Sequence, residues 1–217
     1  MIKISRITDV TEHIDGLRAV IFDLDDTLYS EREYVKSGFA AVAEILPEIN
    51  NAGERLYSLF ELGKNAIDEL LISEGLYSAQ LKERCLEAYR SHAPKIHLYG
   101  GVHELLLALR QEGYMLGIIT DGRPDGQRAK IRALGLEPLL DEIIVTDELG
   151  GAEYRKPCDK AFRLMHEKIS ARLGMEIAFA ETCYVGDNTS KDFIAPDSLG
   201  MRSVWFDNPE GIYYLRS

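Results

Sequence analysis

The stretch AVIFDLDDT, residues 19–27, decides how this chain folds. Its first four residues form an unbroken apolar run, which is typical of a short strand buried on both faces. Three acids, Asp23, Asp25 and Asp26, follow directly. In an open parallel sheet, ligands bind outside the carboxyl ends of the strands. The sequence therefore predicts that these acids lie where a binding site is expected.

Short apolar runs of the same kind recur along the chain, and helical patterns separate them. The runs cover residues 115–119, 143–145, 183–185 and 203–206. The helical patterns cover residues 102–111, 127–134, 159–173 and 191–199. Such alternation predicts an α/β fold in which crossover helices connect the strands of a parallel sheet.

One interval breaks this alternation directly after the first strand. Residues 30–93 contain no convincing strand, and their apolar positions repeat with helical spacing. We therefore expect a helical domain at 30–93, inserted into an α/β core formed by residues 1–29 and 94–217.

The bulk composition narrows the class of protein. With 217 residues, 46% hydrophobic and 28% charged, the chain is typical of globular proteins. Its formal net charge of −11 repels nucleic acids and anionic membranes, so we expect neither as a partner. Three cysteines are too few for a disulfide framework, and no apolar stretch is long enough to span a bilayer. We expect a cytoplasmic protein, either a monomer or a dimer.

The acids after the first strand predict a metal site. Side chains alternate along extended backbone, so Asp23 and Asp25 project toward the same space. Two carboxylates about 4 Å apart repel by roughly 4 kcal/mol at an effective dielectric near 20, so a cation should offset them. A later strand adds Asp187 and Asp192, and an all-oxygen set suits Mg²⁺. The alternative is that each acid caps the helix that follows it, which fits Asp26 best.

Two further loops are candidates for binding a phosphate. One apolar run ends in Thr120-Asp121-Gly122, which offers a hydroxyl group and loop amides to an anion. Lys156 precedes Pro157 in the loop before a helix, where its charge can neutralise an anionic substrate. Taken alone, Thr120 is equally consistent with a turn residue, and a loop lysine is usually only solvated. The specificity lies in the order in which all these residues occur.

In that order, the segments resemble the four sequence motifs of the haloacid dehalogenase-like (HAD) superfamily. They are Asp-x-Asp-x-Thr at 23–27, Thr120, Lys156-Pro157 and Gly-Asp-x-x-x-x-Asp at 186–192. The likeness covers about residues 19–206 and implies a Rossmann-like core with an inserted helical C1 cap. Asp121 departs from the Asn or Ser common among relatives, and Cys158 stands where Asp is common. The first 18 residues have no functional interpretation.

The resemblance also implies a role for each motif residue. Asp23 would be the nucleophile that forms an aspartyl-phosphate, and Asp25 the general acid and base. Mg²⁺ would be held by Asp23, the backbone carbonyl of Asp25, Asp187 and, directly or through water, Asp192. The phosphoryl group would be bound at Thr120, Asp121 and Lys156.

We therefore expect a Mg²⁺-dependent phosphohydrolase acting on a small phosphorylated metabolite. A phosphomutase is the main alternative, since it uses the same core. A 2-haloacid dehalogenase is less consistent with Asp25, because it needs no second acid, and a non-catalytic binding protein has little reason to keep the acids. We expect residues 30–93 to act as a lid, with hinges at 29–33 and 99–102. The substrate cannot be identified from the sequence.

Overall fold

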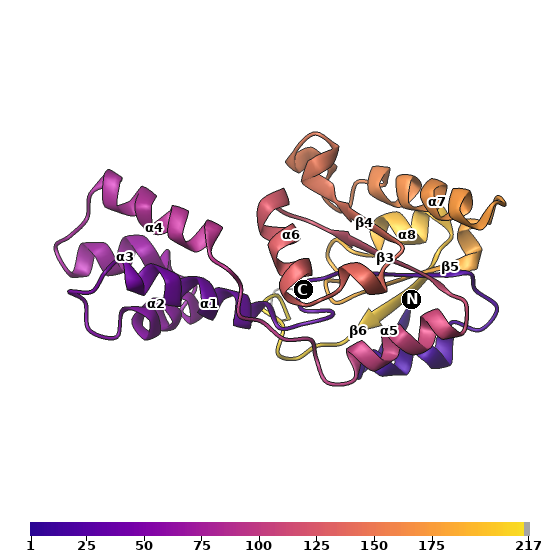
Figure 1. The fold of residues 1–217 in the computed structure, drawn as a ribbon, viewed down its shortest axis with the longest axis horizontal. Coiled ribbons are helices and arrows are strands. Elements are labelled where there is room, and N and C mark those ends of the chain that lie inside the picture. Colours follow the sequence, from indigo (N-terminus) through magenta and orange to yellow (C-terminus); the bar gives the residue numbers. More distant parts are fainter. Residues whose placement is uncertain (215–217) are drawn as a thin grey trace. The chain divides into compact units, whose positions relative to one another are not determined.

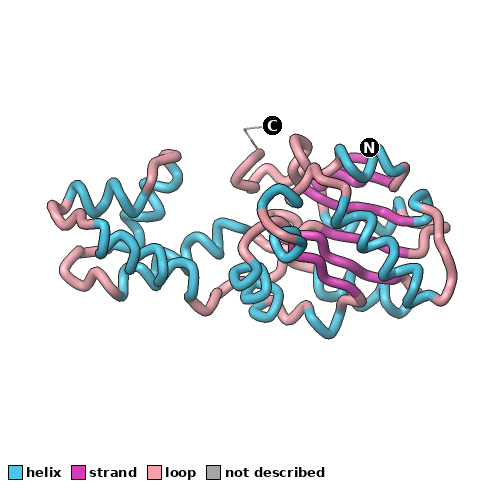
Figure 2. Tube along the Cα trace, turned by 90° about the horizontal axis from the view of Figure 1, so that it is seen from above, coloured by secondary structure: helices cyan, strands magenta, loops and turns pink. Residues whose placement is uncertain are grey.

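The computed structural model describes residues 1–214 and divides the chain into two compact units. The core unit comprises Met1–Glu31 and the chain from His97 onward, and the helical unit comprises Arg32–Ile96. Figure 1 follows the chain through both, and Figure 2 distinguishes the strands of the core unit from the helices. No helix among the described residues is long and apolar enough to cross a membrane.

The core unit is built on one six-stranded sheet in which every pair of neighbours is parallel. The spatial order is β1-β6-β5-β2-β3-β4. The strands are β1 (Ile2–Ile4), β2 (Ala19–Phe22), β3 (Met115–Thr120), β4 (Glu142–Val145), β5 (Thr182–Gly186) and β6 (Arg202–Phe206). The predicted α/β fold with a Rossmann-like parallel sheet is confirmed.

Helices cover both faces of this sheet, which explains why its strands are almost continuously apolar. They are α5 (Val102–Gln111), α6 (Pro124–Ala133), α7 (Lys160–Leu173) and α8 (Ile194–Leu199). In Figure 1, α7 and α8 lie on one side of the sheet, and α5 lies on the other with the short 3₁₀ helix Ile7–His13. Gly117 on β3 permits the close packing of α7, since a Cβ there would lie 2.8 Å from the sulfur of Met165.

The strand order brings the predicted site residues together. β2 lies between β3 and β5, with Phe22 opposite Ile118 on one side and Val185 on the other. The pairing extends one residue further, because the Asp23 amide donates a 2.8 Å hydrogen bond to the Val185 carbonyl. Asp23, Thr120 and Asp187 therefore leave adjacent strands at one edge of the sheet.

The helical unit contains no strand among its residues, all of which the structure describes. Its helices are α1 (Glu31–Glu44), which begins at the last residue of the core segment, α2 (Ala52–Glu61), α3 (Ala66–Ser73) and α4 (Ala79–Ser91). They bury apolar side chains against one another, including Phe39, Leu56, Leu71 and Cys85. Its role as a cap stays a prediction.

Candidate active site

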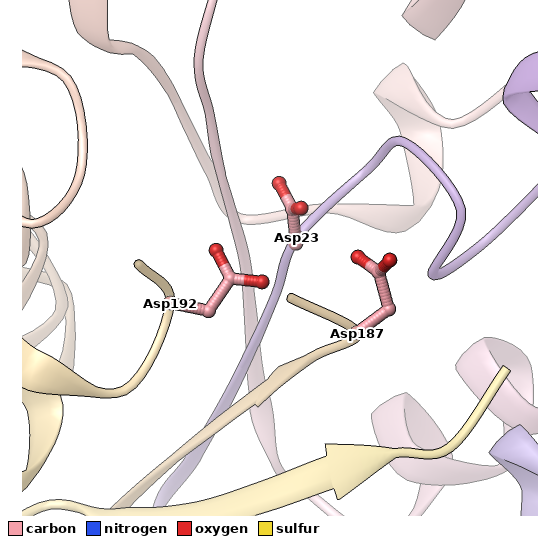
Figure 3. A group of neighbouring side chains, drawn as sticks. All are labelled: Asp23, Asp187 and Asp192. Carbon is pink, nitrogen blue, oxygen red and sulfur yellow. The ribbon is translucent and has the colours of Figure 1, made fainter. Parts of the chain in front are cut away.

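Three carboxylates gather beside the ends of β2 and β5. Asp23 follows β2, Asp187 follows β5, and Asp192 lies in the next turn of chain. One oxygen of each lies within 4.8 Å of those of the other two. Figure 3 shows the three side chains arranged around a common space. Asp23 and Asp192 are almost fully buried, so their charges are poorly screened by solvent.

Lys156 supplies a buried positive charge to this cluster. Its ammonium nitrogen lies 2.8 Å from Asp23 Oδ1 and 2.8 Å from Asp192 Oδ1. It also donates to the Tyr184 hydroxyl at 2.9 Å. Burial alone would lower the pKa of this lysine, but the two carboxylates outweigh burial and hold the pKa well above its usual value. Lys156 is therefore a permanent cation in the site.

One lysine does not balance three acids. Burial, followed by the charges of Asp23 and Asp192, raises the pKa of Asp187 to about 9. Burial also raises the pKa of Asp23 to about 7, although Lys156 opposes that shift. Burial is the largest cause of both shifts, and the neighbouring carboxylates add to it, so the charged form of all three acids together is unfavourable without a further cation. A hard divalent cation with oxygen ligands would stabilise the charged form, and the three converging carboxylates fit Mg²⁺.

Gly186 allows Asp192 to reach the cluster. A Cβ at this position would lie 2.6 Å from Asp192 Oδ2, a distance at which the carboxylate would have to move. The same oxygen accepts a 2.9 Å hydrogen bond from the Asn188 amide. The glycine of the Gly-Asp motif is thus required by the close approach of its own downstream acid.

Asp25 faces a different set of groups. One carboxylate oxygen accepts from the Tyr29 hydroxyl and lies 2.7 Å from the Lys130 ammonium. The other accepts from Gln127 Nε2 at 2.8 Å. Burial would raise the pKa of Asp25, but the charge of Lys130 and these hydrogen bonds outweigh burial and lower it. The carboxylate therefore lies outside the group of three acids that fits a metal.

The end of β3 and the loop after it contain the other predicted phosphate-binding residues, of which Asp121 lines the charged cavity and Thr120 does not. Thr120 is fully buried, and its hydroxyl accepts a 2.5 Å hydrogen bond from Gln127. The Asp121 carboxylate pairs with Lys191 at 2.9 Å and accepts from Thr146 and the Lys156 amide, each at 3.0 Å. Since this carboxylate is anionic and already bonded, the part of Asp121 suited to an anion is its backbone N–H.

Asp26 has a structural role. It adopts a left-handed conformation with φ of 52°, which Asp tolerates better than most residues. Its two carboxylate oxygens accept from the Glu31 amide at 2.9 Å and from the Ile212 amide at 2.7 Å. Because Glu31 is the first residue of α1, one of these bonds satisfies an amide that has no partner within the helix, which supports the interpretation of Asp26 as a capping residue.

A cavity of about 330 Å³ opens onto these groups, large enough for a small phosphorylated molecule. Charged residues dominate its lining, which belongs entirely to the core unit. The lining residues are Asp23, Asp25, Asp26, Glu31, Asp121, Arg155, Lys156, Asp187, Asn188, Lys191 and Tyr213.

Sequence reasoning missed four polar partners of the motif residues: Tyr29, Gln127, Lys130 and Lys191. Gln127 and Lys130 are buried despite lying on a helix with few apolar residues. The signal that could have identified them is their spacing of three, which places both on one face of α6. Lys191 lay inside the quoted motif, but only the fold reveals that it pairs with Asp121.

Comparisons with known proteins identify the family and the fold. The chain matches the haloacid dehalogenase-like hydrolase family over residues 20–206. It is 29% identical over 205 residues to the glyceraldehyde 3-phosphate phosphatase of Methanocaldococcus jannaschii, covering 87% of this chain and 84% of that protein. It is 30% identical to the protein of the same name from Methanopyrus kandleri, covering 87% and 83% respectively. The magnesium-bound HAD-hydrolase YfnB of Bacillus subtilis superposes with a TM-score of 0.63 at 21% identity, covering 88% of this chain and 87% of that one.

Proposed function

Because the chain belongs to the haloacid dehalogenase-like hydrolase family, we propose that it is a Mg²⁺-dependent phosphatase of small phosphorylated metabolites. Asp23 is the proposed nucleophile. The observation that carries the proposal is the position of its carboxylate, buried in a charged cavity, 2.8 Å from Lys156 and beside Asp187 and Asp192. A nucleophilic carboxylate next to fixed positive charge suits transfer of an anionic phosphoryl group.

The proposed reaction has two halves. In the first, an oxygen of Asp23 attacks phosphorus while the bond from phosphorus to the ester oxygen breaks, and Asp25 gives a proton to the departing oxygen. This step needs Asp25 to be protonated in the substrate complex, although Lys130 and the hydrogen bonds around it lower its pKa in the substrate-free site. In the second, water attacks the aspartyl-phosphate, and the Asp25 carboxylate takes one water proton. The bond between Asp23 and phosphorus then breaks, which releases inorganic phosphate and restores both side chains.

Fixed groups would stabilise the charge that spreads over the phosphoryl oxygens. Lys156 would contact one of them, and the Thr120 hydroxyl and the Asp121 N–H would donate to others. Mg²⁺, held by Asp23, Asp187, Asp192 and the backbone carbonyl of Asp25, would supply further positive charge at the same oxygens. The chain's own residues orient the substrate and move the protons.

The substrate class is supported by the relatives. The two described above are named glyceraldehyde 3-phosphate phosphatase, and a Thermus thermophilus relative, 31% identical over 56% of this chain, is named phosphoserine phosphatase. These names denote short phosphorylated metabolites, which a cavity of about 330 Å³ can hold. A cytoplasmic location is part of the proposal and fits the three cysteines, all of which are free thiols.

A panel of phosphate esters with three to six carbons, assayed with Mg²⁺ and with excess EDTA, tests this function. We expect turnover only with the metal, and Asp23→Asn should lower it by at least about 10³-fold because the nucleophile is lost. Beryllofluoride, which imitates a phosphoryl group, should bind the wild-type protein and not this variant. Full activity in EDTA, or an active Asp23→Asn enzyme, would contradict the proposal.

A further inference from the structure

We propose that Gln127 and Lys130 on α6 are positioning residues for Asp25. The proposal rests on the function proposed above and deepens it, because it names the groups that orient the acid and base. Neither residue belongs to the four motifs, and neither lines the cavity that would hold the substrate. The contact that both residues share is with Asp25, and Gln127 also contacts Thr120.

Lys130 holds one side of the carboxylate. Its ammonium nitrogen lies 2.7 Å from Asp25 Oδ1, and its side chain is only 6% exposed. Burying a lysine is costly unless it is paired, and Asp25 provides the pairing charge. Tyr29, fully buried, donates its hydroxyl to the same oxygen. Asp25 Oδ1 is thus bonded from two directions.

Gln127 holds the other side and links Asp25 to the proposed phosphate site. Its Nε2 donates to Asp25 Oδ2 at 2.8 Å and to Thr120 Oγ1 at 2.5 Å. An amide nitrogen carries two hydrogens, which suffices for both bonds. Because the Thr120 hydroxyl accepts from Gln127, its own hydrogen stays available to donate elsewhere. Gln127 therefore fixes the acid and base relative to a group that would bind the phosphoryl oxygens.

Such fixation matters for proton transfer more than for substrate binding. With both oxygens bonded, the Asp25 carboxylate cannot rotate freely, and a general acid must lie within hydrogen-bond reach of the departing oxygen. A displacement of about 1 Å at a reacting group can cost about 100-fold in rate. A purely structural role for the two residues would instead change stability and leave the dependence of the rate on the leaving group unaltered.

Leaving groups separate these two roles. An alkyl phosphate needs a proton on its departing oxygen, whereas p-nitrophenyl phosphate releases a stable phenolate without one. The variants are Gln127→Met and Lys130→Met, and Lys130→Arg tests rescue by a retained charge. Arg132→Met is the matched control, because Arg132 is exposed on the same helix. Rapid-mixing and steady-state kinetics with Mg²⁺ would compare all four proteins with the wild type.

For an alkyl phosphate, we expect each Met variant to lower kcat by about 10- to 100-fold with little change in KM. With p-nitrophenyl phosphate, phosphorylation of Asp23 should keep its rate, while hydrolysis of the aspartyl-phosphate slows because it needs the base. A burst of nitrophenolate should therefore appear. Lys130→Arg should recover part of the loss, and Arg132→Met should match the wild type.

Equal losses in the rate of Asp23 phosphorylation with both substrates, the absence of a nitrophenolate burst, or no loss on either substrate would overturn the positioning role. If Lys130→Met does not fold, Gln127→Met gives the same test, because it removes no charge. The two proposals fail in different ways. A wild-type protein without Mg²⁺-dependent phosphatase activity would contradict the proposed function, whereas an active wild type with unaltered variants would contradict only the roles of Gln127 and Lys130.

Discussion

The absence of a side chain at Gly186 leaves room for the Asp192 carboxylate beside the candidate metal site. Since a Cβ there would lie 2.6 Å from Asp192 Oδ2, Gly186→Ala should push that carboxylate out of the cluster. We expect Mg²⁺ affinity to fall by about 10- to 100-fold, the usual cost of disturbing the surroundings of a metal ligand. Isothermal titration calorimetry with Mg²⁺ measures this loss directly.

Gly53→Ala is the control for that substitution. Gly53 lies inside α2, where a Cβ would make ordinary contacts of 3.5 Å or more, and alanine favours a helix. We expect this variant to bind Mg²⁺ like the wild type. If Gly186→Ala also binds Mg²⁺ normally, Asp192 is not needed close to the metal.

Lys156 is the residue whose loss should most damage the metal-free core. Lys156→Met would leave Asp23 and Asp192 buried without their cation, and breaking a buried ion pair on one side costs about 3–5 kcal/mol. Urea denaturation in EDTA should show this decrease in the free energy of unfolding. Arg163→Met removes an exposed pair with Asp159, so its cost should stay below about 1 kcal/mol. Similar values for both variants would show that the Lys156 pairs contribute little.

Asp23, Thr120 and Asp187 could be identified from the sequence because each lies at the end of a strand that an apolar run predicts. Lys156 lies far beyond the end of β4 and was identified only by its place in the order of the motifs. Their partners could not, because hydrogen bonding depends on which helix packs where. Gln127 was recognised only as part of a helix, and the bond from its side chain to Asp25 spans 102 positions. Asp121 shows the same limit, since its pairing with Lys191 depends on β3 and β5 flanking the same strand.

At the scale of elements, the apolar runs predicted five strands, and the structure adds β1 at the sheet edge. Its three residues, Ile2, Lys3 and Ile4, alternate between apolar and charged side chains. This pattern is too short to distinguish a strand from a loop. Pairing with β6 stabilises it, with Ile2 opposite Val204. Part of the N-terminal segment thus gains a structural explanation that the sequence alone did not provide.

The linker that returns to the core contains two adjacent glycines with different constraints. Gly101 precedes α5 with φ of +83°, and a Cβ there would lie 3.1 Å from Thr8. A Cβ at Gly100 would have no atom within 4 Å, apart from those of Gly100 and its chain neighbours. We expect Gly101→Ala to lower the free energy of unfolding by about 1–2 kcal/mol, the cost of a left-handed L-residue. Gly100→Ala should change it by less than about 0.5 kcal/mol.

Thermal denaturation of both variants checks this expectation, and equal stabilities would contradict it. The result also decides how the hinge hypothesis for residues 99–102 can be tested. A proline at position 101 would both strain the backbone and restrict a hinge, because proline fixes φ near −65° whereas Gly101 has φ of +83°. The two effects could not then be separated. Alanine at Gly100 restricts the backbone without the left-handed strain.

At the scale of the molecule, the residues of the candidate active site fall on one of the two units. Every residue that lines the charged cavity belongs to the core unit. The two linkers are joined on the core side, where the Tyr99 amide donates to the Leu28 carbonyl at 2.9 Å and Tyr29 pairs with Leu98. Because Tyr29 also donates to Asp25, the linker contacts the proposed acid and base.

This connection gives a test of the proposed lid. If the helical unit closes when the site is filled, Mg²⁺ with beryllofluoride should slow hydrogen exchange in the linkers 29–33 and 99–102, which closure would order. Mg²⁺ alone should slow exchange mainly at the ends of β2 and β5, where its ligands lie. Asp23→Asn, which lacks the proposed beryllofluoride acceptor, is the control and should give the Mg²⁺ pattern in both conditions. Linkers that exchange equally fast with and without beryllofluoride in the wild type would contradict the lid, and specificity would then have to come from the loops of the core unit.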